Sequence, residues 1–549
     1  MQVRGLSALA PASVVSTGML FWACAVLMVC CLLLAGGTRV GFLADSFIQL
    51  LAIPVLLVSL SRLLDLPFSK QPRQALIFCL AIVLIPLLQL IPLPPGIWTA
   101  LPNREPMGGA FDLLERELPW MPISVSPHAT WLSALSLLPP LAIFFGTLSL
   151  GYRERRLLSL VVLALGVLSV FVGLSQVAQG PKSQLRFFEH TNPTEAIGFF
   201  ANRNHFAALL YALTLLAAAW AVEAAIASEA GRKRQEAGWI VAPVASFTVL
   251  VLLVAAQAMA RSRAGLGLTI VALFGAFALA VSDRRSKSGV TPGKLLLGAT
   301  AFAVILALQY GLYRILERLS EDPLEDGRLV FGRITIEAAK AYMPFGSGLG
   351  TFVPVYAMFE RPENALINAY VNRAHNDAIE LWLETGVVGL GLMGIFVIWL
   401  GHTSLKLWRS NVDGTRELDL SLARAATIVA ALIIAHSFVD YPLRTGAMMA
   451  IMAFACGLLI EPPTGIEGEA SSVSHQNVWE RGSRGGAPVV RPTTISSPPQ
   501  STSGCPDLGT PPPRAAGEQW GQDIEWPEEW RKQPKTRSPD VAAKAPRST

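Results

Sequence analysis

Long apolar stretches constrain this chain more than any other feature of its sequence. Apolar residues make up 52% of the 549 residues, charged residues make up only 15%, and the mean hydropathy is +0.46. A run of about twenty apolar residues crosses a bilayer as a helix, because a helix satisfies its own backbone groups in lipid. The sequence therefore predicts an all-α polytopic membrane protein with about twelve transmembrane helices. The predicted spans lie near Thr17–Ala35, Phe42–Leu60, Ala75–Leu93, Trp131–Leu150, Leu157–Ala178, His205–Ala225, Trp239–Ala260, Ala264–Val281, Leu295–Tyr313, Gly386–Leu405, Leu422–Val439 and Gly446–Ile460.

Basic residues give the expected orientation of these spans. Every even-numbered span before the last is followed by a short loop rich in Lys and Arg, and such loops stay in the cytoplasm. We therefore expect a multi-pass membrane protein with both termini in the cytoplasm. The loops after odd-numbered spans then face the opposite side of the membrane, which is the periplasm if the cell is Gram-negative. The basic residues are Arg62, Lys70, Arg73, Arg153, Arg155, Arg156, Arg232, Lys233, Arg234, Arg284, Arg285, Lys287, Lys406, Arg409 and Arg416.

Loop lengths and composition divide the chain into four regions. Residues 1–313 hold the first nine spans, residues 314–385 form a large periplasmic loop, residues 386–460 hold the last three spans, and residues 461–549 form a tail. The tail is rich in Pro, Ser, Gly and charge, so we expect it to be disordered and cytoplasmic. The six cysteines show no C-x-x-C spacing, which indicates packing residues and no metal site. The sequence predicts membrane lipids as partners, with no cofactor and no nucleic acid.

The large loop ends in Ala374-His375-Asn376-Asp377, followed by Glu384. A His at the membrane surface is suited to general-base chemistry, since its unperturbed pKa lies near neutral pH. The alternative is that His375 merely enters a helix and that Asn376 and Asp377 cap it. Position alone leaves these two interpretations open.

Arginines at the outer boundary are the second unusual feature. Arg261 and Arg263 flank a tight outer turn, where membrane topology disfavours positive charge. Arg203 opens an apolar helix from the outside, although its charge opposes the helix dipole. Arg328 and Arg333 add charge in the large loop. Since Arg forks bind phosphate bidentately, these residues predict an anionic lipid-linked ligand; snorkelling to ordinary lipid phosphates is the alternative.

Two further patterns favour structural roles. The run Gly346–Gly350 looks like a phosphate loop but lacks the preceding strand and the Lys-Ser/Thr of that motif, so a turn back to the membrane is the better interpretation. His436 and Asp440 lie four residues apart, so they should share one helix face. We interpret them as a structural pair rather than as catalytic groups.

These motifs, in this order, resemble those of the O-antigen ligase / Wzy polymerase superfamily of polytopic bacterial glycosyltransferases. The resemblance covers roughly Met19 to Ile460. It rests on Gly198–Ala207, Ser262–Gly265, Pro344–Phe352, Ala374–Asp377 with Glu384–Gly386, and His436–Asp440.

The resemblance implies a metal-independent, inverting transfer of a polysaccharide from undecaprenyl pyrophosphate to an acceptor hydroxyl, outside the cytoplasmic membrane. His375 would take the acceptor proton, and Arg203, Arg263 and Arg261 would hold the donor pyrophosphate. Asn376, Glu384, Arg328 and Arg333 would support these groups.

Three functions compete at this point. In a lipopolysaccharide ligase the acceptor is a lipid A core sugar, whereas in a polymerase of O-antigen or exopolysaccharide it is a second lipid-linked glycan. A transporter would move the lipid-linked glycan without chemistry, but transporters gather polar groups near the bilayer midplane. The charges here gather at one face, which argues against transport.

Overall fold

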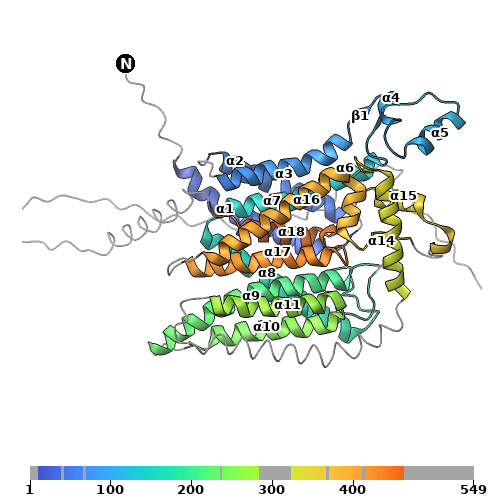
Figure 1. Cartoon of the computed structure of the whole chain (residues 1–549). Helices are drawn as coiled ribbons and strands as arrows, with labels where there is room; N and C mark the ends of the chain where they lie inside the picture. Colours follow the sequence, from blue (N-terminus) through green and yellow to red (C-terminus); the bar gives the residue numbers. More distant parts are fainter. Residues whose placement is uncertain are drawn as a thin grey trace, which may run out of the picture. The chain divides into compact units, whose positions relative to one another are not determined.

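The computed structural model describes residues 10–38, 43–65, 70–189, 191–234, 238–282, 323–365, 370–410 and 416–462. Within these ranges, nine helices are long and apolar enough to cross a membrane, and two shorter apolar helices, Gly18–Leu34 and Gly446–Leu458, accompany them. The predicted all-α polytopic class is therefore confirmed (Figure 1). The ninth predicted span, Leu295–Tyr313, lies outside the described residues, as does nearly all of the 461–549 tail. The total of twelve spans stays a prediction.

The elements follow one another with few strands among the described residues. They are α1 (Ala10–Leu34), α2 (Leu43–Asp65), α3 (Lys70–Gln89), β1 (Pro92–Leu93), α4 (Pro95–Trp98), α5 (Glu105–Leu113), β2 (Met121–Pro122), α6 (Pro127–Leu135), α7 (Leu138–Leu148), α8 (Tyr152–Gln179), α9 (Arg203–Lys233), α10 (Val241–Ala260), α11 (Arg263–Ser282), α14 (Pro323–Ala341), α15 (Phe352–Phe359), the 3-10 helix η2 (Pro362–Asn364), α16 (Asp377–Arg409), α17 (Glu417–Ser437), the 3-10 helix η4 (Pro442–Arg444) and α18 (Gly446–Leu458).

Helices α9 and α17 form the interior of the bundle. In each of them 72% of an 18-residue apolar stretch is buried inside the protein, whereas the corresponding share is only 28% in α10. Helix α9 packs against α10, α11 and α17, and α17 also packs against α18. Both helices are rich in Ala, and small residues let neighbouring membrane helices approach closely, which suits α9 and α17 to the interior.

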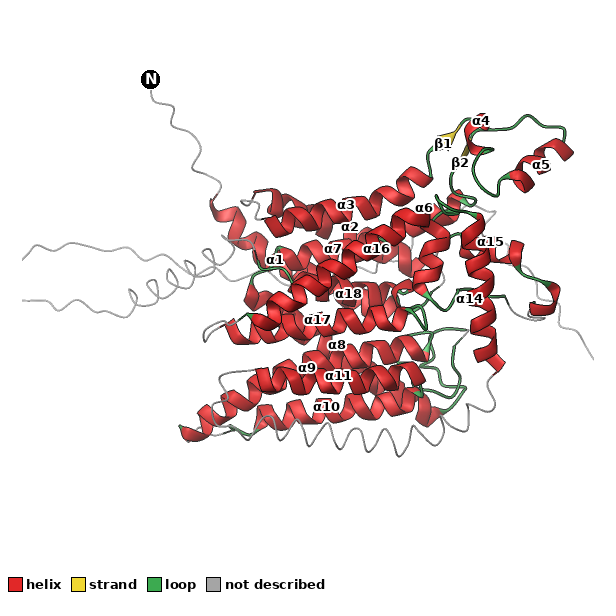
Figure 2. Ribbon diagram, in the orientation of Figure 1, coloured by secondary structure: helices red, strands yellow, loops and turns green. Residues whose placement is uncertain are grey.

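One end of the bundle is covered by the large loop. Helix α14 lies across the ends of the spans, and both α14 and α15 pack against α16 (Figure 2). Their apolar faces share a small core of their own with the start of α16, which includes Phe331, Phe352, Tyr356 and Leu383. The described part of the large loop is therefore a folded cap.

The glycine run of the large loop supports a break in α16. Gly386 has φ 59°, which interrupts the helix. Backbone hydrogen bonds connect the turn to this point: Gly348 N–H donates to Glu384 O (3.0 Å), and Val387 N–H donates to the carbonyl of Pro344, just before the glycine run (3.0 Å). Gly346 also takes a positive φ of 79°. These contacts agree with a turn that returns the loop to the membrane rather than with a phosphate loop.

The C-terminal ends of α7 and α18 meet at one arginine, Arg155. The buried guanidinium of Arg155, in the first turn of α8, donates to the carbonyls of Leu148 and Leu150 at the end of α7 (3.1 and 3.0 Å). It also donates to the carbonyls of Gly457 and Ile460 at the end of α18 (3.2 and 2.6 Å). Helix ends leave such carbonyls without partners, and Arg155 satisfies four of them.

Candidate functional site

His375 stands at the entrance to α16 in an uncommon backbone conformation. Its φ is 53°, a left-handed value that costs an L-residue about 1–2 kcal/mol. The residues on both sides hold this conformation. Ala374 N–H donates to Glu380 Oε2 (2.9 Å), and the Asn376 side chain accepts from the N–H groups of Ala378 and Ile379 (3.0 and 3.1 Å). Strain that is maintained in this way is typical of functional sites.

The imidazole of His375 lies beside a buried carboxylate. Its Nδ1 is 3.5 Å from Oδ1 of Asp440, and its ring contacts Tyr441 edge-on with the centroids 4.8 Å apart. About 20% of the His375 side chain remains exposed, against 1% for Asp440. With Nδ1 directed at the carboxylate, Nε2 is the nitrogen on the opposite side of the ring. A carboxylate beside an imidazole nitrogen favours one tautomer and orients the ring.

The Asp440 carboxylate accepts two hydrogen bonds and lies near a positive charge. Asn204 Nδ2 donates to its Oδ2, Tyr441 N–H donates to its Oδ1 (3.0 Å), and Arg328 Nη2 lies 4.0 Å from Oδ2. Burial alone would raise the pKa of Asp440, but the nearby His375, His205 and Arg328 outweigh burial and bring the pKa below its ordinary value. The carboxylate is therefore an anion at neutral pH.

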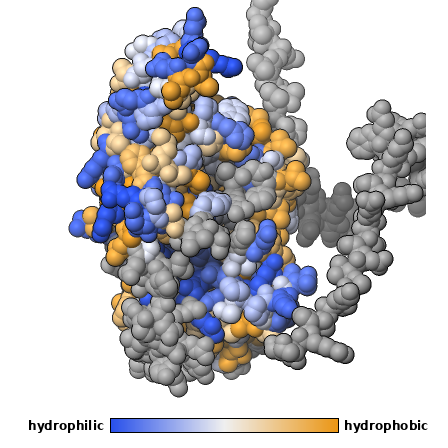
Figure 3. Space-filling model, turned by 90° about the vertical axis from the view of Figure 1, so that its right-hand side faces the viewer, coloured by the Kyte–Doolittle hydropathy of each residue, from blue (hydrophilic) through white to orange (hydrophobic). Residues whose placement is uncertain are grey.

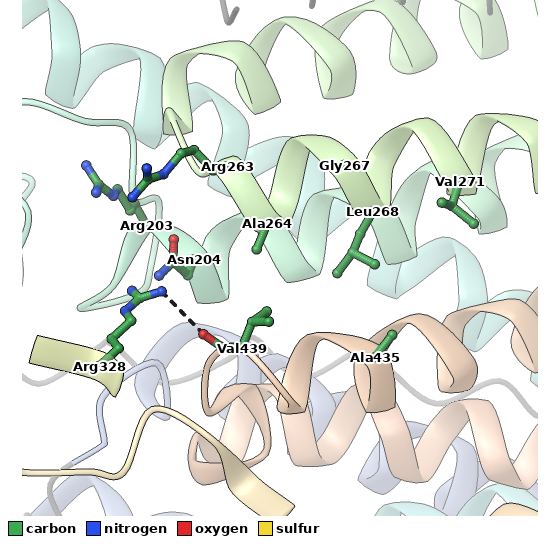
Figure 4. Close-up of a pocket in the computed structure, with 10 residues that line it drawn as sticks. All are labelled: Arg203, Asn204, Arg263, Ala264, Gly267, Leu268, Val271, Arg328, Ala435 and Val439. Atoms are coloured by element: carbon green, nitrogen blue, oxygen red, sulfur yellow. Dashed lines mark hydrogen bonds between the residues drawn. The ribbon is translucent and has the colours of Figure 1, made fainter. Parts of the chain in front are cut away.

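A cavity of about 470 Å³ opens next to this pair. Figure 4 shows the side chains of Arg203, Arg263 and Arg328 gathered at one end of it, where Asn204 also lies. The part further along the helices is apolar, with α11 on one side and α17 on the other. The apolar lining consists of Ala264, Gly267, Leu268, Val271, Ala435 and Val439.

The cavity and the imidazole are connected through Asp440. Asn204 and Arg328 both line the cavity and both approach the Asp440 carboxylate, which in turn faces His375. Seen from the end of the molecule that carries the large loop, hydrophilic patches lie between hydrophobic ones (Figure 3). The site therefore joins a cationic mouth, an apolar groove and a base candidate.

The predicted site residues divide into two groups. The structure brings His375, Arg203, Arg263 and Arg328 together. Arg261 takes φ 51° as the C-cap of α10 and does not line the cavity, and Arg333 is exposed on α14. The arginines that meet are thus those at the starts of α9, α11 and α14.

Asn376 and Glu384 have structural contacts. Asn376 is the N-cap of α16, as the alternative interpretation of this cluster expected, and its Nδ2 also donates to the carbonyl of Phe438 (2.8 Å). Glu384 is buried and pairs with Arg444 (2.8 Å). Neither residue lines the cavity.

Three contacts could not be read from spacing. The sequence predicts a side-chain pair of His436 and Asp440, but in the structure Asp440 N–H donates to the His436 carbonyl (2.9 Å) and the Asp440 carboxylate faces His375 (3.5 Å). Glu195 pairs with Arg203 (2.9 Å) and offsets the charge that conflicts with the dipole of α9. Arg444 approaches three carboxylates of α16. In each of these three contacts, the sequence shows only that a charged residue (Asp440, Glu195 or Arg444) lies close to the end of a predicted span.

Residues 248–394 match the family model described as O-antigen ligase. The matched range covers most of α10, all of α11, α14 and α15, and the first half of α16, so it includes Arg263, Arg328 and His375. A comparison with curated proteins finds no match. The match confirms the resemblance that the sequence motifs indicated: over residues 248–394 this chain carries the domain of the O-antigen ligase family, within the O-antigen ligase / Wzy polymerase superfamily.

Proposed function

We propose that this protein is an O-antigen ligase-like glycosyltransferase. It moves a polysaccharide from undecaprenyl pyrophosphate to an acceptor hydroxyl at the outer face of the bacterial cytoplasmic membrane. One observation carries the proposal: three guanidinium groups converge at the mouth of an apolar groove, and one of them, that of Arg328, lies 4.0 Å from the carboxylate that faces His375.

The cavity suits a ligand that has a diphosphate at one end and an apolar chain at the other. The forks of Arg203, Arg263 and Arg328 match phosphate oxygens. The apolar lining of α11 runs from Ala264 to Val271, which is about 10 Å of helix. This length accommodates the first units of a polyprenyl chain while the pyrophosphate stays at the membrane surface.

The proposed reaction is a single displacement at the anomeric carbon of the donor sugar. His375 takes the proton of the acceptor hydroxyl as its oxygen forms a bond to that carbon. The bond between the carbon and the pyrophosphate oxygen breaks, its electron pair stays on undecaprenyl pyrophosphate, and the configuration inverts. The arginines stabilise the charge on the leaving group, and Asp440 stabilises the imidazolium. The step needs no metal.

The acceptor in this proposal is a lipid A core sugar. The alternative is a Wzy-type polymerase, whose acceptor is another lipid-linked glycan. Both reactions use the same arginines and the same base, so the site supports each of them equally. Polysaccharide analysis of a deletion strain distinguishes them: a ligase deletion leaves polymer on the lipid carrier, and a polymerase deletion leaves single repeat units.

The test compares His375→Ala, Arg263→Ala and Arg263→Lys in membrane vesicles from a deletion strain of the source bacterium. The measured quantity is the rate at which endogenous polysaccharide leaves undecaprenyl pyrophosphate. We expect His375→Ala to lower the rate by about 10² to 10⁴-fold, because it removes the base. Arg263→Ala should cost about 10²-fold, and Arg263→Lys should cost less, because Lys retains the charge but not the fork.

Arg361→Ala is the matched control. This arginine belongs to the large loop as well, but 66% of its side chain is exposed and it pairs with Glu337 at the surface (3.8 Å). Its rate should equal that of the unmodified protein. Full activity of His375→Ala would favour the transport function, and full activity of both Arg263 variants would remove the diphosphate site.

A further inference from the structure

Five ionisable side chains lie together near the backbone of His375. Three are carboxylates of α16, namely Asp377, Glu380 and Glu384, whose spacing of three and four residues puts them on one helix face. The other two are Arg373, from the end of the large loop, and Arg444, from η4. The three carboxylates are buried, and 13% and 15% of the two arginine side chains are exposed.

Glu380 ties down the backbone directly before His375. One carboxylate oxygen, Oε2, accepts the N–H of Ala374 (2.9 Å). The other oxygen, Oε1, accepts Nη1 of Arg373 (2.9 Å) and lies 3.4 Å from Nε of Arg444. Both oxygens are therefore occupied by donors, and one of those donors belongs to the residue that precedes the left-handed His375.

Arg444 connects the segment that carries Asp440 to the start of α16 through ion pairs. It lies four residues after Asp440 and approaches Asp377 Oδ1 (3.4 Å), Glu380 Oε1 (3.4 Å) and Glu384 Oε2 (2.8 Å). Burial lowers the pKa of Arg444, but the three carboxylates outweigh burial and raise it above its ordinary value. The guanidinium therefore remains charged and holds η4 against the start of α16.

The two halves of the His375–Asp440 pair thus come from separate segments, and the buried charges join those segments. Burying ionisable groups is costly even when they are paired, and well-packed apolar residues often stabilise a fold as well. A buried ionic network is better explained where a particular geometry must be kept. The geometry at stake here is the 3.5 Å approach of Nδ1 to the carboxylate.

We infer that Glu380 and Arg444 are positioning residues that fix His375 against Asp440 for proton transfer. This inference rests on the proposed glycosyl transfer. Glu380→Gln keeps the size of the side chain but has only one acceptor oxygen, so its amide N–H₂ must oppose either Ala374 N–H or the guanidinium groups. Arg444→Lys keeps the charge and has no planar fork with which to reach three carboxylates.

The test measures transfer rate and ligand affinity separately, with the full chain. The rate is that of endogenous polysaccharide leaving undecaprenyl pyrophosphate in deletion-strain vesicles. The affinity is that of undecaprenyl pyrophosphate for the protein in nanodiscs. Glu380→Gln and Arg444→Lys should lower the rate by about tenfold to a hundredfold, since a small misplacement of a reacting group has effects of this size. The affinity should change less than about twofold, because neither residue lines the cavity.

A double-variant cycle separates positioning from a merely structural role. If Glu380 acts through the His375–Asp440 pair, adding Glu380→Gln to Asp440→Asn should lower the rate much less than it does in the unmodified protein. The same should hold for Arg444→Lys, which serves as the second variant if Glu380→Gln does not fold. Equal losses in both backgrounds, full rates of both single variants, or a loss of affinity parallel to the loss of rate would overturn the inference.

The outcome also distinguishes this inference from the proposed function. If His375→Ala transfers polysaccharide normally, the proposed function fails and the positioning role fails with it. If His375→Ala is inactive while Glu380→Gln and Arg444→Lys are fully active, only the positioning role fails. Glu337→Gln, whose side chain is 55% exposed on α14, is the control that should leave both rate and affinity unchanged.

Discussion

At the scale of single residues, the site depends on one carboxylate that stays ionised. Asp440 is buried, receives hydrogen bonds from Asn204 and its neighbouring backbone, and faces His375. A group whose pKa is lowered on folding contributes stability above its unfolded pKa, which for Asp is about 3.9. That contribution is lost as the pH falls through the folded pKa.

The first prediction concerns Asp440→Asn in detergent or nanodiscs. At pH 7 we expect this variant to unfold more easily by about 1–3 kcal/mol, because the donors around residue 440 lose a charged acceptor. The difference from the unmodified protein should shrink as the pH falls below about 4, where the carboxyl group of Asp440 gains its proton in the unfolded chain while it stays ionised in the folded protein. Thermal unfolding between pH 3 and pH 8 measures it. Asp112→Asn, on the exposed side of α5, should show no such difference, and equal stability at pH 7 would contradict the assignment.

Local chain geometry explains which residues of the site could be predicted. His375 was recognisable because it ends the large loop, and Arg263 because it opens a span from outside. The contact of Asp440 with His375 could not be predicted. A spacing of four residues from His436 implies a continuing helix, whereas α17 ends at Ser437 and the chain turns. Arg261 was grouped with Arg263, but as the left-handed C-cap of α10 it diverges from the residue that starts α11.

At the scale of elements, the break in α16 joins the large loop to the membrane. The hydropathy pattern located both the loop and the span, and the glycines suggested a turn. Sequence alone could not show that the backbone of this turn forms hydrogen bonds with α16 around Gly386, because these bonds join residues some forty positions apart. The positive φ of 59° at Gly386 makes the junction dependent on one glycine.

The second prediction is that Gly386→Ala disrupts this junction. An added Cβ would overlap the carbonyl oxygen of Pro344, and the left-handed φ disfavours any L-residue. We expect a loss of about 2 kcal/mol or more in stability. Thermal unfolding and protease cleavage within the large loop measure the loss.

Gly391→Ala is the matched control on the same helix. A Cβ at this position meets nothing within 4 Å, so the variant should be neutral or slightly more stable. Equal behaviour of the two variants would show that the break at Gly386 is dispensable.

At the scale of the whole molecule, the two ends of the bundle differ in their polar groups. One end carries the cationic cavity and the large loop. The other end carries Arg155, which holds the ends of α7 and α18 together, and the pair of Arg156 with Asp419 (2.6 Å). The sequence predicted this polarity from basic loops, but it did not indicate that one of those arginines would be buried.

The third prediction is that Arg155→Met destabilises the bundle. Met fills similar space but leaves four carbonyls without their donor, so we expect a loss of about 2–4 kcal/mol. Arg153→Met changes an exposed residue of the same helix turn and should have little effect. Unfolding temperatures of the two purified variants provide the comparison, and similar temperatures would refute the role of Arg155.

The fourth prediction concerns orientation in the membrane. In a Cys505→Ser background, Glu117→Cys should react with a membrane-impermeant maleimide in cells whose outer membrane is permeabilised. Arg409→Cys should react only after the cytoplasmic membrane is broken. Both positions are exposed, and the five described native cysteines are buried or partly buried. The reverse labelling pattern would put His375 in the cytoplasm and exclude the proposed reaction.

Arg328 gives the site a further property. The same guanidinium donates to the carbonyl of Val439, lies 4.0 Å from Asp440 and borders the cavity. An anion that enters the cavity therefore competes with Asp440 for a shared cation. An anion that draws Arg328 toward the cavity would also weaken its hydrogen bond to the Val439 carbonyl, just beyond the end of α17. Occupancy of the cavity and the position of the segment that carries Asp440 are thus coupled through a single side chain.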